Sequence, residues 1–93
     1  METAFTVLGR PLGKILEAHA QWAEGESSGK RCVFQNETLN EAQLREVNLQ
    51  RAILRGTTLL DADLSGAKLV DADLNRIDAK WADFRGADMT GAL

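Results

Sequence analysis

The sequence predicts an all-β solenoid over residues 32–93, with an amphipathic α-helix over residues 11–24 covering its N-terminal end. Three observations predict the solenoid. A large apolar residue recurs every five positions through twelve consecutive pentads, a mostly alanine column lies two residues before it, and glycines fall two residues after it. A period of five fits neither a helix face nor a strand, so each pentad must hold a short extended segment followed by a bend.

The N-terminal segment, residues 1–31, is predicted to cap the first coil. Pro11 suits the first turn of a helix and Gly25 suits its end, so residues 25–29 form the linker into the coils. Trp22 is the expected anchor of the cap, and residues 1–9 are expected to pair as a strand on an exposed edge. The face of the helix that should cover the coil carries Leu12, Ile15, Leu16, His19, Trp22 and Ala23.

Two inward columns are predicted to build the core of the coils. They lie two residues apart, which is the spacing of side chains on one face of a strand. In one pentad Ile77 replaces the small residue and Ala79 the large one, which keeps the core volume roughly constant. Glu37 falls in the small column, so we expect the first coil to be distorted there, with Glu37 turned outward or paired with a backbone group. The large column is Phe34, Leu39, Leu44, Leu49, Leu54, Leu59, Leu64, Leu69, Leu74, Ala79, Phe84 and Met89.

Several pentads carry a recognisable five-residue pattern of alanine, aspartate, a large apolar residue and two variable positions. It reads Ala62-Asp63-Leu64-Ser65-Gly66 in one coil and Ala82-Asp83-Phe84-Arg85-Gly86 twenty residues later. This pattern resembles that of the pentapeptide-repeat proteins. The resemblance implies a right-handed, quadrilateral β-helix with four pentads in each coil, so that residues twenty apart stack and twelve pentads make about three coils.

The last predicted coil lacks a cap. Strand edges and apolar side chains would be left next to solvent there, and exposed edges template association. Three explanations stay open: the protein forms a homodimer end to end, the chain is a piece of a longer solenoid, or the last coil frays. The apolar residues of this candidate dimer end are Leu74, Ile77, Phe84 and Met89.

Composition favours a small cytoplasmic protein. The chain has 93 residues and a formal net charge of −3, which does not support a basic face for direct nucleic-acid binding. No stretch approaches the roughly 20 apolar residues of a membrane span, and the N-terminus lacks the basic region of a signal peptide. The single cysteine, Cys32, cannot form an internal disulfide, which fits a reducing compartment.

The sequence predicts no catalytic, cofactor-binding or metal-binding residues. His19 is the one histidine and lies on the apolar face of the predicted helix, which favours a packed cap residue over a general base. Cys32 falls in an inward column and is interpreted as a small core residue. Aspartates recur at one pentad position, but a repeat gives them similar environments, whereas an acid–base pair needs different ones.

These observations favour a non-catalytic protein–protein interaction or scaffold module, in a bacterium, with an unknown partner. Leu60 and Trp81 are predicted to point outward at the same corner of neighbouring coils, which makes them a candidate partner surface. The alternative follows from the resemblance, because some pentapeptide-repeat proteins mimic DNA and bind DNA gyrase or topoisomerase IV. Residues 32–93 hold ten acidic and seven basic residues, a net of −3. The bases that would interrupt a DNA-like field are Arg45, Arg51, Arg55, Arg76, Lys80 and Arg85.

Overall fold

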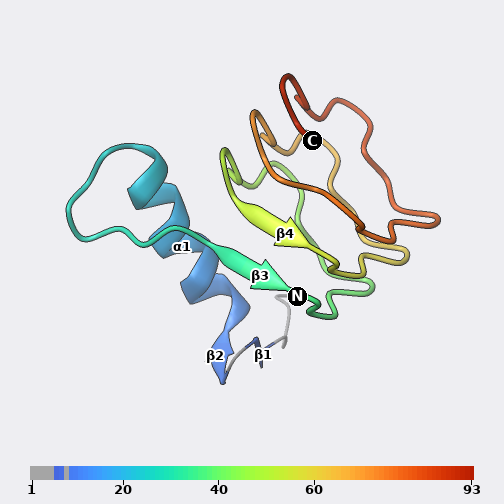
Figure 1. Ribbon diagram of the computed structural model, residues 1–93, viewed down its shortest axis with the longest axis horizontal. Coiled ribbons are helices and arrows are strands. Elements are labelled where there is room, and N and C mark those ends of the chain that lie inside the picture. The colour runs from blue at the N-terminus through green and yellow to red at the C-terminus, as the bar shows by residue number, and fades with distance from the viewer. Residues whose placement is uncertain (1–5, 8) are drawn as a thin grey trace.

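The computed structural model describes residues 6, 7 and 9–93, which form a small hairpin, one helix and a stack of coils (Figure 1). The prediction that residues 1–9 pair as a strand on an exposed edge lies outside this range at residues 1–5 and 8. In the hairpin, Thr6 pairs with Pro11 and Val7 with Arg10, so these residues pair with their own neighbours rather than with a coil edge. The elements are β1 (Thr6–Val7), β2 (Arg10–Pro11), α1 (Leu12–Ala23), β3 (Val33–Gln35) and β4 (Ile53–Arg55).

Helix α1 lies within the predicted range of residues 11–24. Pro11 is its N-cap rather than part of its first turn, because the ψ of 136° at Pro11 is extended and the residue pairs in β2. The helix ends in a Schellman motif, in which Gly25 has a φ of +85°. The N–H of Gly25 donates to the Trp22 carbonyl at 3.0 Å, and the N–H of Glu26 donates to the Gln21 carbonyl at 2.9 Å.

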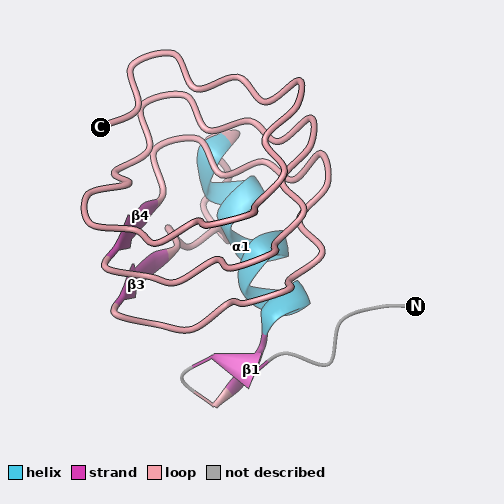
Figure 2. Ribbon diagram, turned by 90° about the vertical axis from the view of Figure 1, so that its right-hand side faces the viewer, coloured by secondary structure: helices cyan, strands magenta, loops and turns pink. Residues whose placement is uncertain are grey.

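The coils stack in a twenty-residue register. Strands β3 and β4 pair in parallel with Val33 opposite Ile53, and seven further parallel bridges each join residues twenty apart. Most of these contacts are single bridges, so the coils are drawn largely as loops around the stack (Figure 2). The fold is therefore β-helix-like, as the sequence predicts, with only β3 and β4 regular enough to form a sheet in the coils.

Every pentad ends in a corner whose residue adopts a positive φ. Gly56, Gly66, Gly86 and Gly91 do so, as the glycine pattern predicts. At eleven corners the carbonyl of the large-column residue accepts the N–H three residues later, as in the bond from Ala62 to Leu59 at 3.1 Å. A positive φ at the third residue is the pattern of a type II turn. The eight remaining corner residues are Asn36, Glu41, Glu46, Arg51, Asp61, Asp71, Arg76 and Trp81.

The first corner is the exception. The N–H of Glu37 makes no turn bond back to Phe34 within the described chain, while the Glu37 carbonyl accepts the N–H of Thr58 at 2.9 Å in the normal register. The Glu37 side chain is half-buried, and its carboxylate accepts no hydrogen bond from the described residues. The expected distortion is therefore confined to one turn.

The core follows the large column and fades toward the last coil. From Phe34 to Leu74 these side chains are 0–8 % exposed, with the small column packed beside them. Ala79 and Phe84 are half-buried, and Met89 is 40 % exposed. Ile77 packs on the edge of the same cluster, next to the position where Ala79 has replaced a larger side chain. At the other end Leu12 and Ile15 of α1 belong to the core, so the helix covers the first coil.

Candidate interaction surfaces

His19 is fully buried and joins α1 to the first coil. Its Nε2–H donates to the carbonyl of Gln50 at 2.9 Å, and its Nδ1 accepts the N–H of Cys32 at 2.9 Å. These two bonds fix the neutral tautomer with the proton on Nε2. Burial is the main cause that lowers the pKa of His19, opposed by the Gln50 hydrogen bond and assisted by the charges of Arg31 and Arg51.

The imidazole of His19 makes the two hydrogen bonds that backbone groups of a corner make in the next coil. One coil later, the carbonyl of Val70 stands where Gln50 stands, and it accepts the N–H of Arg51 at 2.9 Å. Ala52 is the residue twenty positions after Cys32, and its N–H donates to the Leu49 carbonyl at 3.1 Å. The described residues before the first coil form α1 and the linker instead of a pentad. No corner N–H among them therefore donates to the Gln50 carbonyl, and no turn carbonyl accepts the N–H of Cys32. One aromatic ring supplies both, which satisfies backbone groups at the end of the stack.

Trp22 lies between two arginines on the outer side of the cap. The guanidinium carbons of Arg31 and Arg51 each lie 5.1 Å from its ring centroid, and His19 lies 5.4 Å away. Trp22 is half-buried, so the enclosed anchor of the helix is His19 rather than the predicted Trp22. The linker passes very close to this turn of α1. A Cβ atom added at Gly29 would lie 2.1 Å from the backbone nitrogen of Trp22.

The recurring aspartates hold the walls of the coils. Asp63, Asp73, Asp83 and Asp88 each accept the backbone N–H of the residue two positions later, in bonds of 3.0–3.1 Å. This Asx-turn geometry explains the recurrence without any catalytic role. The side chain of Arg85, which donates to Asp83, lowers the pKa of Asp83 to about 2. Hydrogen bonds from the matching residues also lower the pKa of the other three carboxyl groups.

The last coil presents a face of backbone groups that have no partner among the described residues. In the earlier coils, each large-column N–H and each corner N–H donates to the coil that follows. The corresponding donors here are aligned along one edge, beside the half-buried Phe84 and the exposed Met89. We call this the end face. Its seven donors are the N–H groups of Arg76, Ala79, Trp81, Phe84, Gly86, Met89 and Gly91.

The predicted Leu60–Trp81 surface lies at one corner of two neighbouring coils, where Leu60 directly precedes the corner residue Asp61. Trp81 is 76 % exposed and has a φ of +63°, while Leu60 is half-buried. Below Trp81 in the same column stands Asp61, whose N–H donates to the carbonyl of Lys80 at 3.0 Å. A tryptophan in the left-handed region is strained and makes little contact with the core, so the fold alone does not account for it.

A family model for pentapeptide repeats matches eight copies in this sequence, over residues 30–59, 42–78 and 62–93. The chain belongs to the pentapeptide-repeat family. This confirms the resemblance carried by the five-residue pattern, and proteins of this family are generally non-catalytic repeat proteins. No curated protein matches the sequence.

The two residues that sequence analysis considered for chemistry have structural roles in this pentapeptide-repeat protein. Both ring nitrogens of His19 are hydrogen-bonded within the fold. Burial raises the pKa of the Cys32 thiol to about 12, which keeps it protonated and a poor nucleophile at neutral pH. Across residues 6, 7 and 9–93, no helix has the length and apolar character that a membrane crossing requires.

Proposed function

We propose that this pentapeptide-repeat protein is a non-catalytic protein-interaction module that pairs with a second copy of itself through the end face. The observation that supports the proposal is the row of seven backbone donors with no partner among the described residues. Carbonyl groups of Ile77, Ala82 and Ala87 lie on the same edge and accept no hydrogen bond there. A strand edge with alternating donors and acceptors is a template for pairing with another edge.

Apolar side chains add to this edge. Met89 is 40 % exposed, and Ile77 and Phe84 are half-buried, although they belong to columns that are closed in the earlier coils. Burial of such side chains contributes roughly 25 cal/mol per Å² of apolar surface removed from water. A second copy stacked on the end face would cover these side chains and supply partners for the backbone groups in one step.

The proposal includes the finer geometry of the stack. We propose a right-handed, four-sided β-helix of about three coils. The twenty-residue register of the bridges and the corner in every pentad support four sides, because four corners fall within each register length. Two such ends related by a two-fold axis would meet edge to edge.

Light scattering on the purified chain tests the proposal. We expect a dimer for the wild type and a monomer for the double variant Phe84→Asp with Met89→Asp, because four charges would then be buried across the pair. Gln43→Asp, on an exposed wall position of the first coil, is the matched control and should remain dimeric. Circular dichroism shows whether the double variant keeps its fold, and a monomeric wild type overturns the proposal.

The corner of Leu60 and Trp81 is proposed as a second surface, for a protein partner rather than for another copy. The support is the 76 % exposure of Trp81, because exposed tryptophans are typical of binding hot spots. Loss of a captured partner with Trp81→Asp, under conditions that leave the dimer intact, would assign binding to this corner.

The DNA-mimic alternative has less support. A DNA-like surface needs a continuous negative field, but arginines neutralise the wall aspartates. Arg85 pairs with Asp83 at 2.8 Å, Arg55 pairs with Asp73, and Arg45 lies 3.9 Å from Asp63. Inhibition of gyrase supercoiling by micromolar protein would reverse this ranking.

A further inference from the structure

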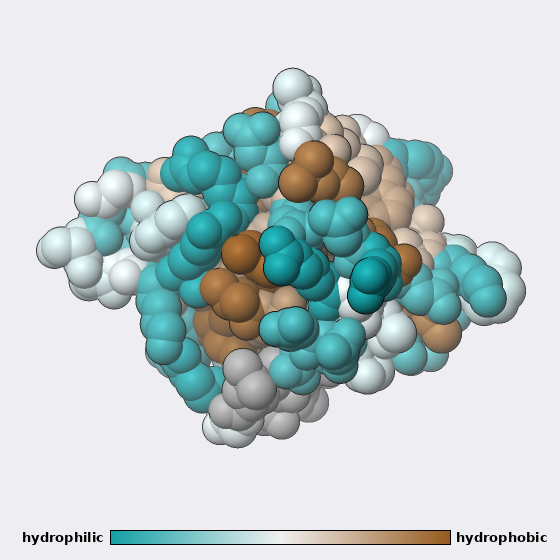
Figure 3. Space-filling view, viewed as in Figure 1, coloured by the Kyte–Doolittle hydropathy of each residue, from teal (hydrophilic) through white to brown (hydrophobic). Residues whose placement is uncertain are grey.

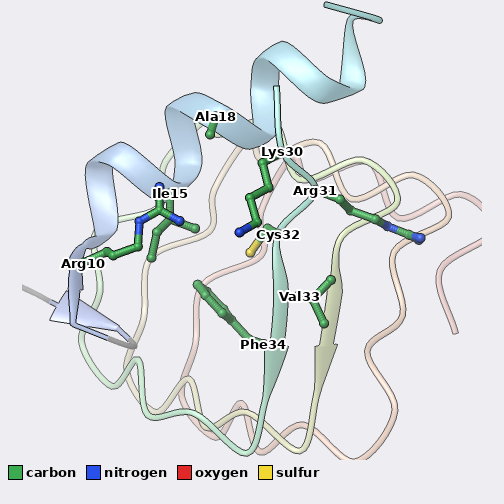
Figure 4. A pocket seen from close by; sticks show the side chains of 8 residues that line it. All are labelled: Arg10, Ile15, Ala18, Lys30, Arg31, Cys32, Val33 and Phe34. Carbon is green, nitrogen blue, oxygen red and sulfur yellow. The ribbon is translucent and has the colours of Figure 1, made fainter. Parts of the chain in front are cut away.

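A hollow of about 280 Å³ lies between α1 and β3, at the opposite end of the stack from the end face. Its floor includes Ile15 of the helix and Phe34 of the strand (Figure 4). The space-filling view shows hydrophobic surface in this region, surrounded by hydrophilic side chains (Figure 3). The hollow therefore offers an apolar floor inside a polar rim.

Two cations converge on this hollow. Arg10 comes from β2 and Lys30 from the segment before β3, and their side chains point toward one another across the opening (Figure 4). Neither forms a salt bridge with an acidic residue in the part of the chain that the structure describes. Arg31 also lines the hollow, but its side chain is directed away, and its Nε donates to the carbonyl of Arg51 at 2.7 Å. Two converging cations repel each other unless an anionic group lies between them.

The third side of the hollow is the edge of β3 that has no strand partner among residues 6, 7 and 9–93. The parallel register places Phe34 opposite Leu54, and the N–H of Ile53 donates to the carbonyl of Cys32 at 3.0 Å. In a parallel ladder, alternate residues direct their backbone groups to opposite sides. The N–H and C=O groups of Val33 and Gln35 therefore point away from β4, on the side where α1 and the hollow lie (Figure 4).

We propose that this hollow binds an acidic peptide segment of a partner protein, in extended conformation, as an added strand beside β3. A backbone edge favours a strand over a compact small molecule, because it recognises repeated N–H and C=O groups. Converging cations select carboxylate side chains, and the floor accepts an apolar side chain from an alternate position of the same strand. The end face is a different surface, so this proposal goes beyond the pairing of two copies.

The test uses the full chain and a capped five-residue peptide of alternating glutamate and valine. We expect binding by calorimetry that weakens as salt increases, and about tenfold weaker binding by Lys30→Glu or Arg10→Glu, which is the effect of losing one effective charge pair. Lys14→Glu is the matched control. Lys14 lies on α1, with its side chain 73 % exposed and outside the hollow, and the Lys14→Glu variant should bind the peptide like the wild type.

A second measurement does not depend on variants. Bound peptide should slow the hydrogen exchange of the Val33 and Gln35 amides, as an added strand would, while the amide of Thr90 on the opposite end is unchanged. Equal binding of a lysine–valine peptide, full binding by Lys30→Glu, or unaltered exchange at Val33 and Gln35 overturns the proposal. The dimer variants at Phe84 and Met89 should still bind, which separates this result from a failure of the end-face proposal.

Discussion

Replacing His19 tests whether one imidazole ring closes the N-terminal end of the coils. His19→Ala removes the acceptor of the Cys32 N–H and the donor to the Gln50 carbonyl. Leaving the buried Cys32 N–H without a partner costs about 1–3 kcal/mol, and the bond to Gln50 contributes about 0.5–1.5 kcal/mol. Truncating a fully buried ring adds about 1–2 kcal/mol through lost packing. We expect the free energy of unfolding to fall by about 2.5–6.5 kcal/mol, the sum of these three contributions.

Urea denaturation followed by circular dichroism measures this change. His19→Gln is the matched variant, because the amide of glutamine offers one acceptor and one donor and does not titrate. It should recover part of the stability that His19→Ala loses. If His19→Ala unfolds at the same urea concentration as the wild type, the two hydrogen bonds of the imidazole do not stabilise the first coil.

The same residue predicts a pH dependence with a defined sign. The pKa of His19 is lowered in the folded protein from 6.5, so the unfolded chain takes up the proton first as the pH falls. The His19 contribution to stability is therefore complete above about pH 6.5 and decreases below it, by at most about 1.4 kcal/mol per pH unit. His19→Gln should remove this slope between pH 6.5 and 5. The carboxyl groups whose pKa is lowered add their own loss only at lower pH.

Three further variants test backbone conformation or close approach at single positions. Gly29→Ala should destabilise the fold by about 2 kcal/mol or more, because the new Cβ would lie 2.1 Å from the Trp22 backbone nitrogen. Gly13→Ala should stabilise α1 by up to about 1 kcal/mol, because nothing lies within 4 Å of the new Cβ. Opposite shifts in melting temperature check both. Trp81→Gly should raise stability by about 1 kcal/mol by relieving a left-handed tryptophan, while weakening any partner bound at that corner; a lower melting temperature would show that the Trp81 side chain stabilises the coil.

The sequence predicts the columns of this fold well because each is a local rule applied twelve times. A single pentad such as Ala62-Asp63-Leu64-Ser65-Gly66 contains the small residue, the Asx acceptor, the large residue and the corner, so an error in one pentad is corrected by its neighbours. The corner rule is broader than the glycines indicate. Eight corners adopt a positive φ without glycine, because the turn bond and the stacking of coils outweigh a cost of roughly 1–2 kcal/mol at each.

The roles of the cap residues could not be predicted in the same way. A histidine at helical spacing on an apolar face indicates burial, but its hydrogen bonds depend on how α1 is aligned with two coil positions, at Cys32 and Gln50. The same holds for Arg10 and Lys30, which are twenty residues apart in sequence and line one hollow because β2 and the linker lie on the same side of β3. Such contacts occur once in the chain, so no repetition reveals them.

The two ends of the stack differ, and this difference limits how copies can associate. If both ends left their coil interiors uncovered, copies could add head to tail and form an open filament. Here α1 covers the interior of the first coil with Leu12 and Ile15, so the helix stands between the end face of one copy and the first coil of another. The proposed pairing of two end faces is symmetric and would close at two copies, which would leave the hollow beside β3 accessible at both outer ends of the pair.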